Sequence, residues 1–145
     1  MKTIPLRKLQ APDIDWVLLR ERATAAMLNA YAPYSRFRVG AALLGSDGSI
    51  SEGCNVENAS YPAGICGERA AIGTAVARGT RTFEALVIVT EADHCTPPCG
   101  ICRQVLQEFA PELPILSISR NGEETRWTLS QLLPFAFNPS SLERR

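Results

Sequence analysis

The spacing of apolar residues changes from helical to strand-like within the first third of the chain. From Asp13, which follows a proline, to Ala30, apolar side chains recur every three or four residues, which predicts a helix with one buried face. Two segments of strand composition follow, Val39 to Leu44 and Ser49 to Cys54. A turn sequence, residues 46–48, lies between them, so we expect the two segments to pair as a β-hairpin.

The rest of the chain alternates between segments typical of helices and segments typical of strands. The run from Phe83 to Thr90 is largely apolar without interruption, as in a strand that is buried on both faces. Gly79 and Pro134 mark the ends of two expected helices. In order, the expected elements are helix 66–77, strand 83–90, helix 100–109, strand 115–119, strand 125–127 and helix 129–133. This succession predicts a sheet covered by helices, an α/β architecture.

Length and charge narrow the classes of protein that fit this pattern. The 145 residues suit a single domain, 1–145, that buries a sizeable core without disulfide bonds. Lys and Arg together number 15, as do Asp and Glu, so the formal net charge of zero argues against a general nucleic-acid binder. No apolar run approaches the roughly 18 residues of a membrane span. Met1 to Gln10 lacks the apolar core of a signal peptide. We therefore expect a cytoplasmic protein that binds neither membranes nor nucleic acids.

Three of the five cysteines form the most specific chemical signal in the chain. In a reducing compartment, closely spaced cysteines are more often metal ligands or catalytic groups than disulfides. Cys99 and Cys102 form a Cys-x-x-Cys pair, and Cys66 supplies a third thiolate at the start of another expected helix. Three protein ligands with one open position are the arrangement of a catalytic zinc site. Helix starts also favour the negative charge of thiolates, so we expect these residues to bind zinc.

The other cysteines and the single histidine have simpler interpretations. We expect Cys54 and Cys95 to be ordinary, unreactive thiols, since a free cysteine usually packs as a small apolar residue. His94 lies five residues before Cys99, which keeps it open as an alternative zinc ligand. An exposed histidine in a loop is the simpler interpretation of that residue.

Glu68 lies two residues after Cys66, within reach of the predicted metal without being a ligand. A carboxylate in that place can take a proton from a water molecule and return it to a substrate. The pattern Cys66-x-Glu68 followed by Pro98-Cys99-x-x-Cys102 is the signature of zinc-dependent deaminases, in which the glutamate is the general acid and base. The signature therefore predicts Zn²⁺ as the cofactor and Glu68 as the catalytic residue.

Nearly the whole chain, and not only the metal motif, resembles the small homotetrameric cytidine deaminases. The segments that carry the resemblance are PYSRFRVGAAL (33–43), GCNVENASYP (53–62), ICGER (65–69), PCGICRQV (98–105) and LLPFAF (132–137). The resemblance implies a three-layer α/β/α fold with a mixed sheet of about five strands covered by helices. It also implies a homotetramer with active sites at the subunit boundaries and a small nucleoside as the substrate.

The resemblance assigns roles outside the metal motif as well. It places Asn55 and Glu57 at the ribose hydroxyls, which suits an amide and a carboxylate two residues apart on an extended segment. It implies that Phe37 packs against the nucleoside and that Phe137 reaches the base bound by a neighbouring subunit. Tyr61 is expected near a subunit boundary. The alternative for Phe37 and Phe137 is packing in the hydrophobic core. The alternative for Asn55 and Glu57 is an ordinary role in shaping the loop.

Three further residues, close to the metal ligands in the sequence, bear on recognition of the base and on the charge around the metal. Arg69 resembles the family's arginine beside the thiolates, where a guanidinium offsets their negative charge; a solvated arginine is the alternative. Gly67 stands where the family usually has alanine. It keeps the backbone amide that the family directs toward the pyrimidine, and it leaves space for an altered base. Pro97 replaces a small hydroxyl residue, and its carbonyl can still accept from the substrate amino group.

The combined expectation is zinc-dependent hydrolysis of cytidine and 2′-deoxycytidine to uridine and 2′-deoxyuridine with release of ammonia, a step of pyrimidine salvage. The nearest alternative, motivated by Gly67, is a deaminase of the same fold that acts on an N4-substituted cytidine or an aminonucleoside antibiotic such as blasticidin S. A polynucleotide deaminase fits less well, because Cys66 stands where those enzymes commonly have histidine. A non-catalytic zinc module is a further alternative, but a structural site needs no unligated acid such as Glu68.

Overall fold

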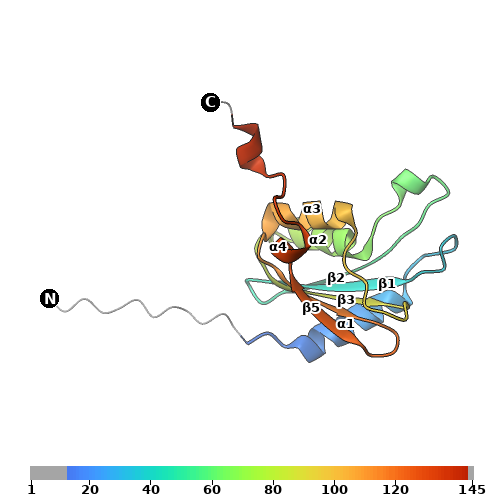
Figure 1. Cartoon of the computed structure of the whole chain (residues 1–145). Coiled ribbons are helices and arrows are strands. Elements are labelled where there is room, and N and C mark those ends of the chain that lie inside the picture. The colour runs from blue at the N-terminus through green and yellow to red at the C-terminus, as the bar shows by residue number, and fades with distance from the viewer. Residues whose placement is uncertain (1–12, 144–145) are drawn as a thin grey trace.

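Five strands form one mixed sheet in the computed structural model of the chain, which describes residues 13–143 (Figure 1). The strands are β1 (Val39–Gly45), β2 (Ile50–Cys54), β3 (Phe83–Thr90), β4 (Pro114–Ile118) and β5 (Glu124–Thr128). Their order across the sheet is β2-β1-β3-β4-β5. The β3–β4 pair is parallel and the other three pairs are antiparallel. The predicted mixed sheet is confirmed.

Helices cover both faces of this sheet and complete the three layers. They are α1 (Trp16–Leu28), α2 (Gly67–Ala77), α3 (Gly100–Phe109) and α4 (Leu129–Leu132), with 3-10 turns η1 (Tyr61–Ala63) and η2 (Pro139–Leu142). α1 lies on one face, and α2 and α3 lie side by side on the other (Figure 1). Within residues 13–143 we find no helix that is both long and apolar enough to cross a membrane.

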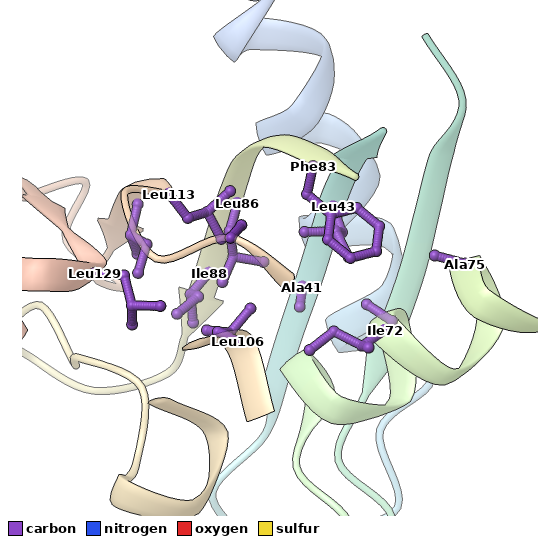
Figure 2. Packing of buried hydrophobic residues seen from close by; sticks show 13 residues of the cluster. Ala41, Leu43, Ile72, Ala75, Phe83, Leu86, Ile88, Leu106, Leu113 and Leu129 are labelled. Atoms are coloured by element: carbon purple, nitrogen blue, oxygen red, sulfur yellow. The ribbon is translucent and has the colours of Figure 1, made fainter. Parts of the chain in front are cut away.

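The central strand β3 contributes side chains to two separate hydrophobic cores, because its side chains alternate between the faces of the sheet. Leu86 and Ile88 pack toward α2 and α3, where Figure 2 shows them among the residues of that cluster. Val87 and Val89 pack toward α1 on the other side. Burial on both faces explains why the strand is apolar at successive positions, as the sequence predicted.

Two glycines allow helices to approach the sheet closely. A Cβ built on Gly40 of β1 would lie 1.9 Å from the backbone oxygen of Ala23 in α1. A Cβ built on Gly53 of β2 would lie 2.2 Å from the backbone oxygen of Gly67 in α2. Neither place admits a side chain, so these glycines set the distance between each helix and its strand. For Gly53 this distance fixes where the first turn of α2 lies.

The element boundaries follow the capping residues. The bounds of β3 and α3 are those predicted. α1 begins at Trp16 and not at Asp13, because the side chain of Asp15 accepts from the backbone N–H of Leu18 at 3.0 Å and caps the helix. α2 begins one residue later than predicted, since Cys66 is its N-cap residue.

The segment between β2 and α2 is irregular but firmly held. The backbone of Tyr31 donates to the carbonyl of Asn55 at 3.0 Å and accepts from the N–H of Glu57 at 2.8 Å. Val56 and Ile65 exchange two backbone hydrogen bonds of 3.0 Å each. These contacts keep residues 55–57 extended, which fixes Asn55 and Glu57 near the start of α2.

Candidate active site

Three cysteine side chains converge where α2 and α3 begin. The Sγ atoms of Cys66, Cys99 and Cys102 all lie within 4.8 Å of one another, and those of Cys66 and Cys99 are 3.7 Å apart. Cys66 and Cys99 are the N-cap residues of the two helices, and Cys102 is fully buried in the first turn of α3. Zn–S bonds of about 2.3 Å at tetrahedral angles separate sulfur atoms by about 3.8 Å. The three thiols therefore fit a single zinc ion.

The surroundings of this cluster favour negative charge. The helix N-termini of α2 and α3 contribute partial positive charge. The guanidinium of Arg69 donates from Nη2 to Cys66 Sγ at 3.5 Å, and its buried Nε has no acceptor within residues 13–143. Hydrogen bonds from Cys102 and from Arg69 lower the pKa of the Cys66 thiol to about 5. The pKa of Cys102 is raised, because Cys102 is bonded to Cys66 and buried.

Glu68 is buried beside the thiols although it carries a carboxyl group. Its residue is only 5% exposed, and it lines a cavity that Cys66 and Cys99 also line. Burial, with a smaller contribution from the charge of Cys66, raises the pKa of Glu68 to about 7. A carboxyl group poised near neutrality can both accept and return a proton, which is what a general acid and base requires.

The cavity has a volume of about 300 Å³, the lower end of the range for small-molecule sites. It lies at the carboxyl end of β3, beside the starts of α2 and α3. The predicted site residues that line it are Phe37, Asn55, Glu57, Cys66, Glu68 and Cys99. A cavity of this size suits a nucleoside-sized molecule.

Asn55 lines the cavity and also holds the neighbouring backbone in place. The side chain is largely buried, its Oδ1 accepts from the N–H of Val39 at 2.8 Å, and its Nδ2 donates to the carbonyl of Phe37 at 2.7 Å. These bonds hold the segment that carries Phe37 against the end of β2. One N–H hydrogen and one lone pair of the amide are left for a ligand.

Glu57 is held by the segment just before Phe37. Its Oε1 accepts from the backbone N–H groups of Tyr34 and Ser35, each at 3.0 Å, and its Oε2 accepts from the hydroxyl of Ser35. These bonds, those of Ser35 above all, lower the pKa of Glu57 below its usual range. The carboxylate is therefore charged at neutral pH and fixed at the cavity wall, where it can accept from hydroxyl groups.

Three of the candidate residues that do not line the cavity are exposed at the surface. Phe137 and Tyr61 are 59% and 76% exposed, and neither lines it. Figure 1 shows the chain after α4 leading away from the sheet, and η1 projecting from the body of the molecule. His94 also stays apart from the thiol cluster: its side chain is 90% exposed and lies 3.5 Å from Glu123. The thiol cluster in the described part of the chain is therefore formed by cysteines alone.

Gly67 corrects one expectation about the base. A Cβ built on it would lie 3.3 Å from the carbonyl oxygen of Val39 and 3.4 Å from the backbone of Gly53 and Cys54, so it would point at the strands. The absent methyl group therefore leaves no extra room for a bulkier base. The N–H of Gly67, in the first turn of α2, has no acceptor within the helix and stays available to a ligand.

The comparison with protein families identifies this arrangement. Residues 17–116 match the family model of the cytidine and deoxycytidylate deaminase zinc-binding region. The chain belongs to this family. A cytidine deaminase from Sporosarcina psychrophila is 45% identical over 78% of this chain and 84% of that protein. The crystal structure of a cytidine deaminase from Burkholderia pseudomallei superposes with a TM-score of 0.82 at 44% identity, covering 86% of this chain and all of that one.

A relative with a different printed activity bears on the alternative substrate. The blasticidin-S deaminase from Bacillus cereus is 31% identical over 71% of this chain and 79% of that protein. It is more distant than the cytidine deaminases that are 42–45% identical to this chain, so these relatives favour cytidine within the family. The zinc-binding region of the family and the three converging thiols together identify zinc as the cofactor.

Sequence reasoning about this deaminase missed part of the cavity wall. Ser35, Ile88, Thr90 and Thr96 line the cavity but were not expected there. Thr90 is a fully buried polar residue at the end of an otherwise apolar strand, a signal that was available in the sequence. Thr96 carries no such signal, because its place depends on contacts with β4, far along the chain.

Proposed function

We propose that this chain hydrolyses cytidine and 2′-deoxycytidine to uridine and 2′-deoxyuridine and releases ammonia. The observation that carries the proposal is Glu68, a buried acid beside three thiols at a cavity of nucleoside size. A structural zinc site has no use for such an acid, since structural sites are closed by four ligands.

Cys66, Cys99 and Cys102 hold the zinc ion, which when bound lowers the pKa of water and so supplies a nucleophile at neutral pH. Glu68 takes the proton of that water, because it lies beside the cluster and is poised near neutrality. The oxygen of the water adds to C4 while Glu68 gives this proton to ring N3. Glu68 then takes the remaining proton of the added hydroxyl and gives it to the amino group, so that the C4–N bond breaks, a C4 carbonyl forms and ammonia leaves. Arg69 holds Cys66 and offsets the negative charge of the thiolates.

The other residues of the cavity hold the nucleoside. Glu57 accepts from the ribose hydroxyls with the lone pairs that Tyr34 and Ser35 leave free, and the remaining capacity of the Asn55 amide serves the same sugar. Phe37 packs against the nucleoside from the segment that Asn55 braces. The N–H of Gly67 faces the pyrimidine.

The exposed apolar residues near the site favour assembly into a homotetramer. Tyr61, Ile101 and Phe137 are all exposed, on η1, at the start of α3 and after α4. Scattered exposed apolar residues are ordinary, but Ile101 lies between Cys99 and Cys102, and Tyr61 lines a surface pocket together with Glu57, which supports an interaction surface beside the site. In this proposal Phe137 completes the base pocket of a neighbouring subunit, and Tyr61 lies at the boundary.

The free thiols favour a reducing compartment. Cys66, Cys99 and Cys102 must stay reduced to bind metal, and residues 13–143 contain no disulfide. We therefore place the enzyme in the cytoplasm, where its reaction serves pyrimidine salvage.

Ultraviolet absorbance of purified protein with a panel of substrates tests the proposal. Cytidine and 2′-deoxycytidine should be converted, deoxycytidine monophosphate and blasticidin S should not, and removal of zinc by a chelator should stop the reaction. Re-addition of Zn²⁺ should restore it. Conversion of blasticidin S without conversion of cytidine would overturn the proposal in favour of the aminonucleoside alternative.

A further inference from the structure

Residues 95–98, between β3 and α3, form one wall of the cavity and end at the zinc ligand Cys99. Thr96 and Pro97 line the cavity directly. Pro97 and Pro98 have no backbone N–H, so this short loop cannot be held by backbone donors at either position. Side chains from elsewhere in the fold must therefore fix its shape.

Ser117 of β4 holds the loop from the sheet side. It is fully buried, its Oγ accepts from the N–H of Thr96 at 3.1 Å, and the same hydroxyl donates to the carbonyl of Thr96 at 2.9 Å. One side chain thus satisfies both backbone groups of Thr96. The thiol of Cys95 adds a bond to the carbonyl of Ser117 at 3.3 Å.

Arg103 of α3 holds the loop from the helix side. Its Nε donates to the carbonyl of Pro98 at 2.7 Å, and its Nη1 donates to the carbonyl of Leu132 at 2.8 Å. The guanidinium therefore ties the residue next to Cys99 to the end of α4. Both bonds come from one rigid, planar group, which fixes the direction of the carbonyl of Pro98.

The carbonyl between these two anchors is free. Thr96 gives its carbonyl to Ser117 and Pro98 gives its carbonyl to Arg103, whereas the carbonyl of Pro97 has no hydrogen-bond partner within residues 13–143. Pro97 itself lines the cavity. Among the carbonyls of residues 96–98, that of Pro97 is thus the unused one, between two occupied neighbours.

We propose that Ser117 and Arg103 are positioning residues, which hold the carbonyl of Pro97 as the acceptor for the amino group of the substrate. The inference rests on the proposed function, since it needs a substrate with an amino group at C4. Neither residue touches the substrate. Each acts by keeping a neighbouring carbonyl occupied and the loop in one shape.

A substrate pair separates positioning from general stability. Cytidine offers N–H donors at C4, whereas its 4-methoxy analogue offers none, and hydrolysis of either gives uridine, with ammonia or methanol as the second product. Ser117→Ala should lower kcat/KM for cytidine by about tenfold more than for the methoxy analogue, the worth of one hydrogen bond. Ser117→Thr keeps the hydroxyl and should restore the parent ratio.

Two controls support the comparison. Ser119→Ala removes another buried hydroxyl just beyond β4, which accepts from the N–H of Glu123 at 3.1 Å and does not contact Thr96; it should leave the ratio unchanged. Arg103→Lys keeps the charge but loses the planar group whose two nitrogens reach the carbonyls of Pro98 and Leu132, so it should shift the ratio as Ser117→Ala does. It also replaces that variant if Ser117→Ala fails to retain zinc.

Hydrogen exchange of the loop amides tests the anchoring by Ser117 without any substrate turnover. The amide of Thr96 should exchange faster in Ser117→Ala than in the parent, since its acceptor is gone, and slow exchange should return in Ser117→Thr. Equal losses on both substrates, or unchanged exchange at Thr96, would contradict the inference. Absence of cytidine turnover in the parent would instead overturn the proposed function, and the exchange measurement would still test the anchor.

Discussion

The inner part of the site and its rim are built in opposite ways. Glu68 and Cys102 are buried inside one chain, and the starts of two helices fix them. Tyr61 and Phe137 are exposed, and the side chain of Phe137 lies outside the cavity although Gln104 holds its backbone carbonyl at 2.9 Å. In the proposed function the chain therefore completes the chemistry by itself, and a neighbouring subunit supplies the outer wall of the pocket.

This difference separates two kinds of variant. Changes to the inner part should affect the metal and the proton transfer, whatever the state of assembly. Changes to the rim should affect substrate binding and assembly together, and should leave the zinc content unchanged. Loss of zinc in a variant at the rim would contradict this distinction. So would a variant at the thiols that keeps zinc and only weakens assembly.

Cys102→Ala should have the largest effect. It removes a fully buried ligand, so zinc should be lost and deamination should fall by at least about a thousandfold, as expected when several kcal/mol of metal assistance disappear. Metal analysis and the ultraviolet assay measure the two quantities. Cys54→Ala is the matched control, because Cys54 is a free cysteine outside the cluster, and it should keep both zinc and activity.

Glu57→Gln should have the next largest effect. The substitution removes the charge that accepts from Tyr34 and Ser35, and it weakens the proposed bonds to the ribose. Hydrogen bonds to a charged group are worth about 1.5–3 kcal/mol, so kcat/KM should fall by about 10- to 100-fold. Steady-state kinetics with equal zinc content in both proteins check this. Unchanged kinetics would remove Glu57 from the binding site.

Phe137→Ala should have a moderate effect that is confined to the rim. Loss of an aromatic contact at an interface costs about 1–2 kcal/mol, so KM should rise by about tenfold. The tetramer should also dissociate at a protein concentration at which the parent stays assembled. Sedimentation and kinetics measure these. Leu28→Ala, which alters an exposed apolar residue on α1 across the sheet, is the control and should change neither. A monomeric parent with full activity would refute the shared pocket.

Gly67→Ala should have the smallest effect. The added methyl group meets backbone atoms at 3.3–3.4 Å, a tight contact, while alanine favours the helix by about 0.5–1 kcal/mol. The two effects oppose each other, so thermal stability should change little. The ratio of activity on cytidine and blasticidin S should stay the same, because the methyl group points at β1 and β2. A large change in that ratio would show that the added methyl group reaches the base.

The features that could be predicted from the sequence are those determined by residues close together in the chain. Cys99 and Cys102 lie one helical turn apart, and Cys66 and Glu68 begin another helix, so a short motif placed all four. The range of β3 was predicted because burial on both faces leaves a continuous apolar run.

The rest depends on contacts between distant parts of the chain. Ser117 meets Thr96 only because β4 pairs beside β3, a neighbour relation that no single segment encodes. The direction of the absent methyl group at Gly67 depends on how closely α2 packs on β2 at Gly53. Spacing along the sequence cannot supply either distance.

The turnover of Glu68→Gln at full zinc content tests the central claim most directly. The substitution keeps the shape of the side chain and removes the proton carrier, so zinc should be retained while cytidine deamination falls by about 10²–10⁴-fold. Metal analysis and ultraviolet absorbance on the same preparation measure both. Deamination at the parent rate with zinc bound would contradict the account, because Glu68 would then carry no proton in the reaction.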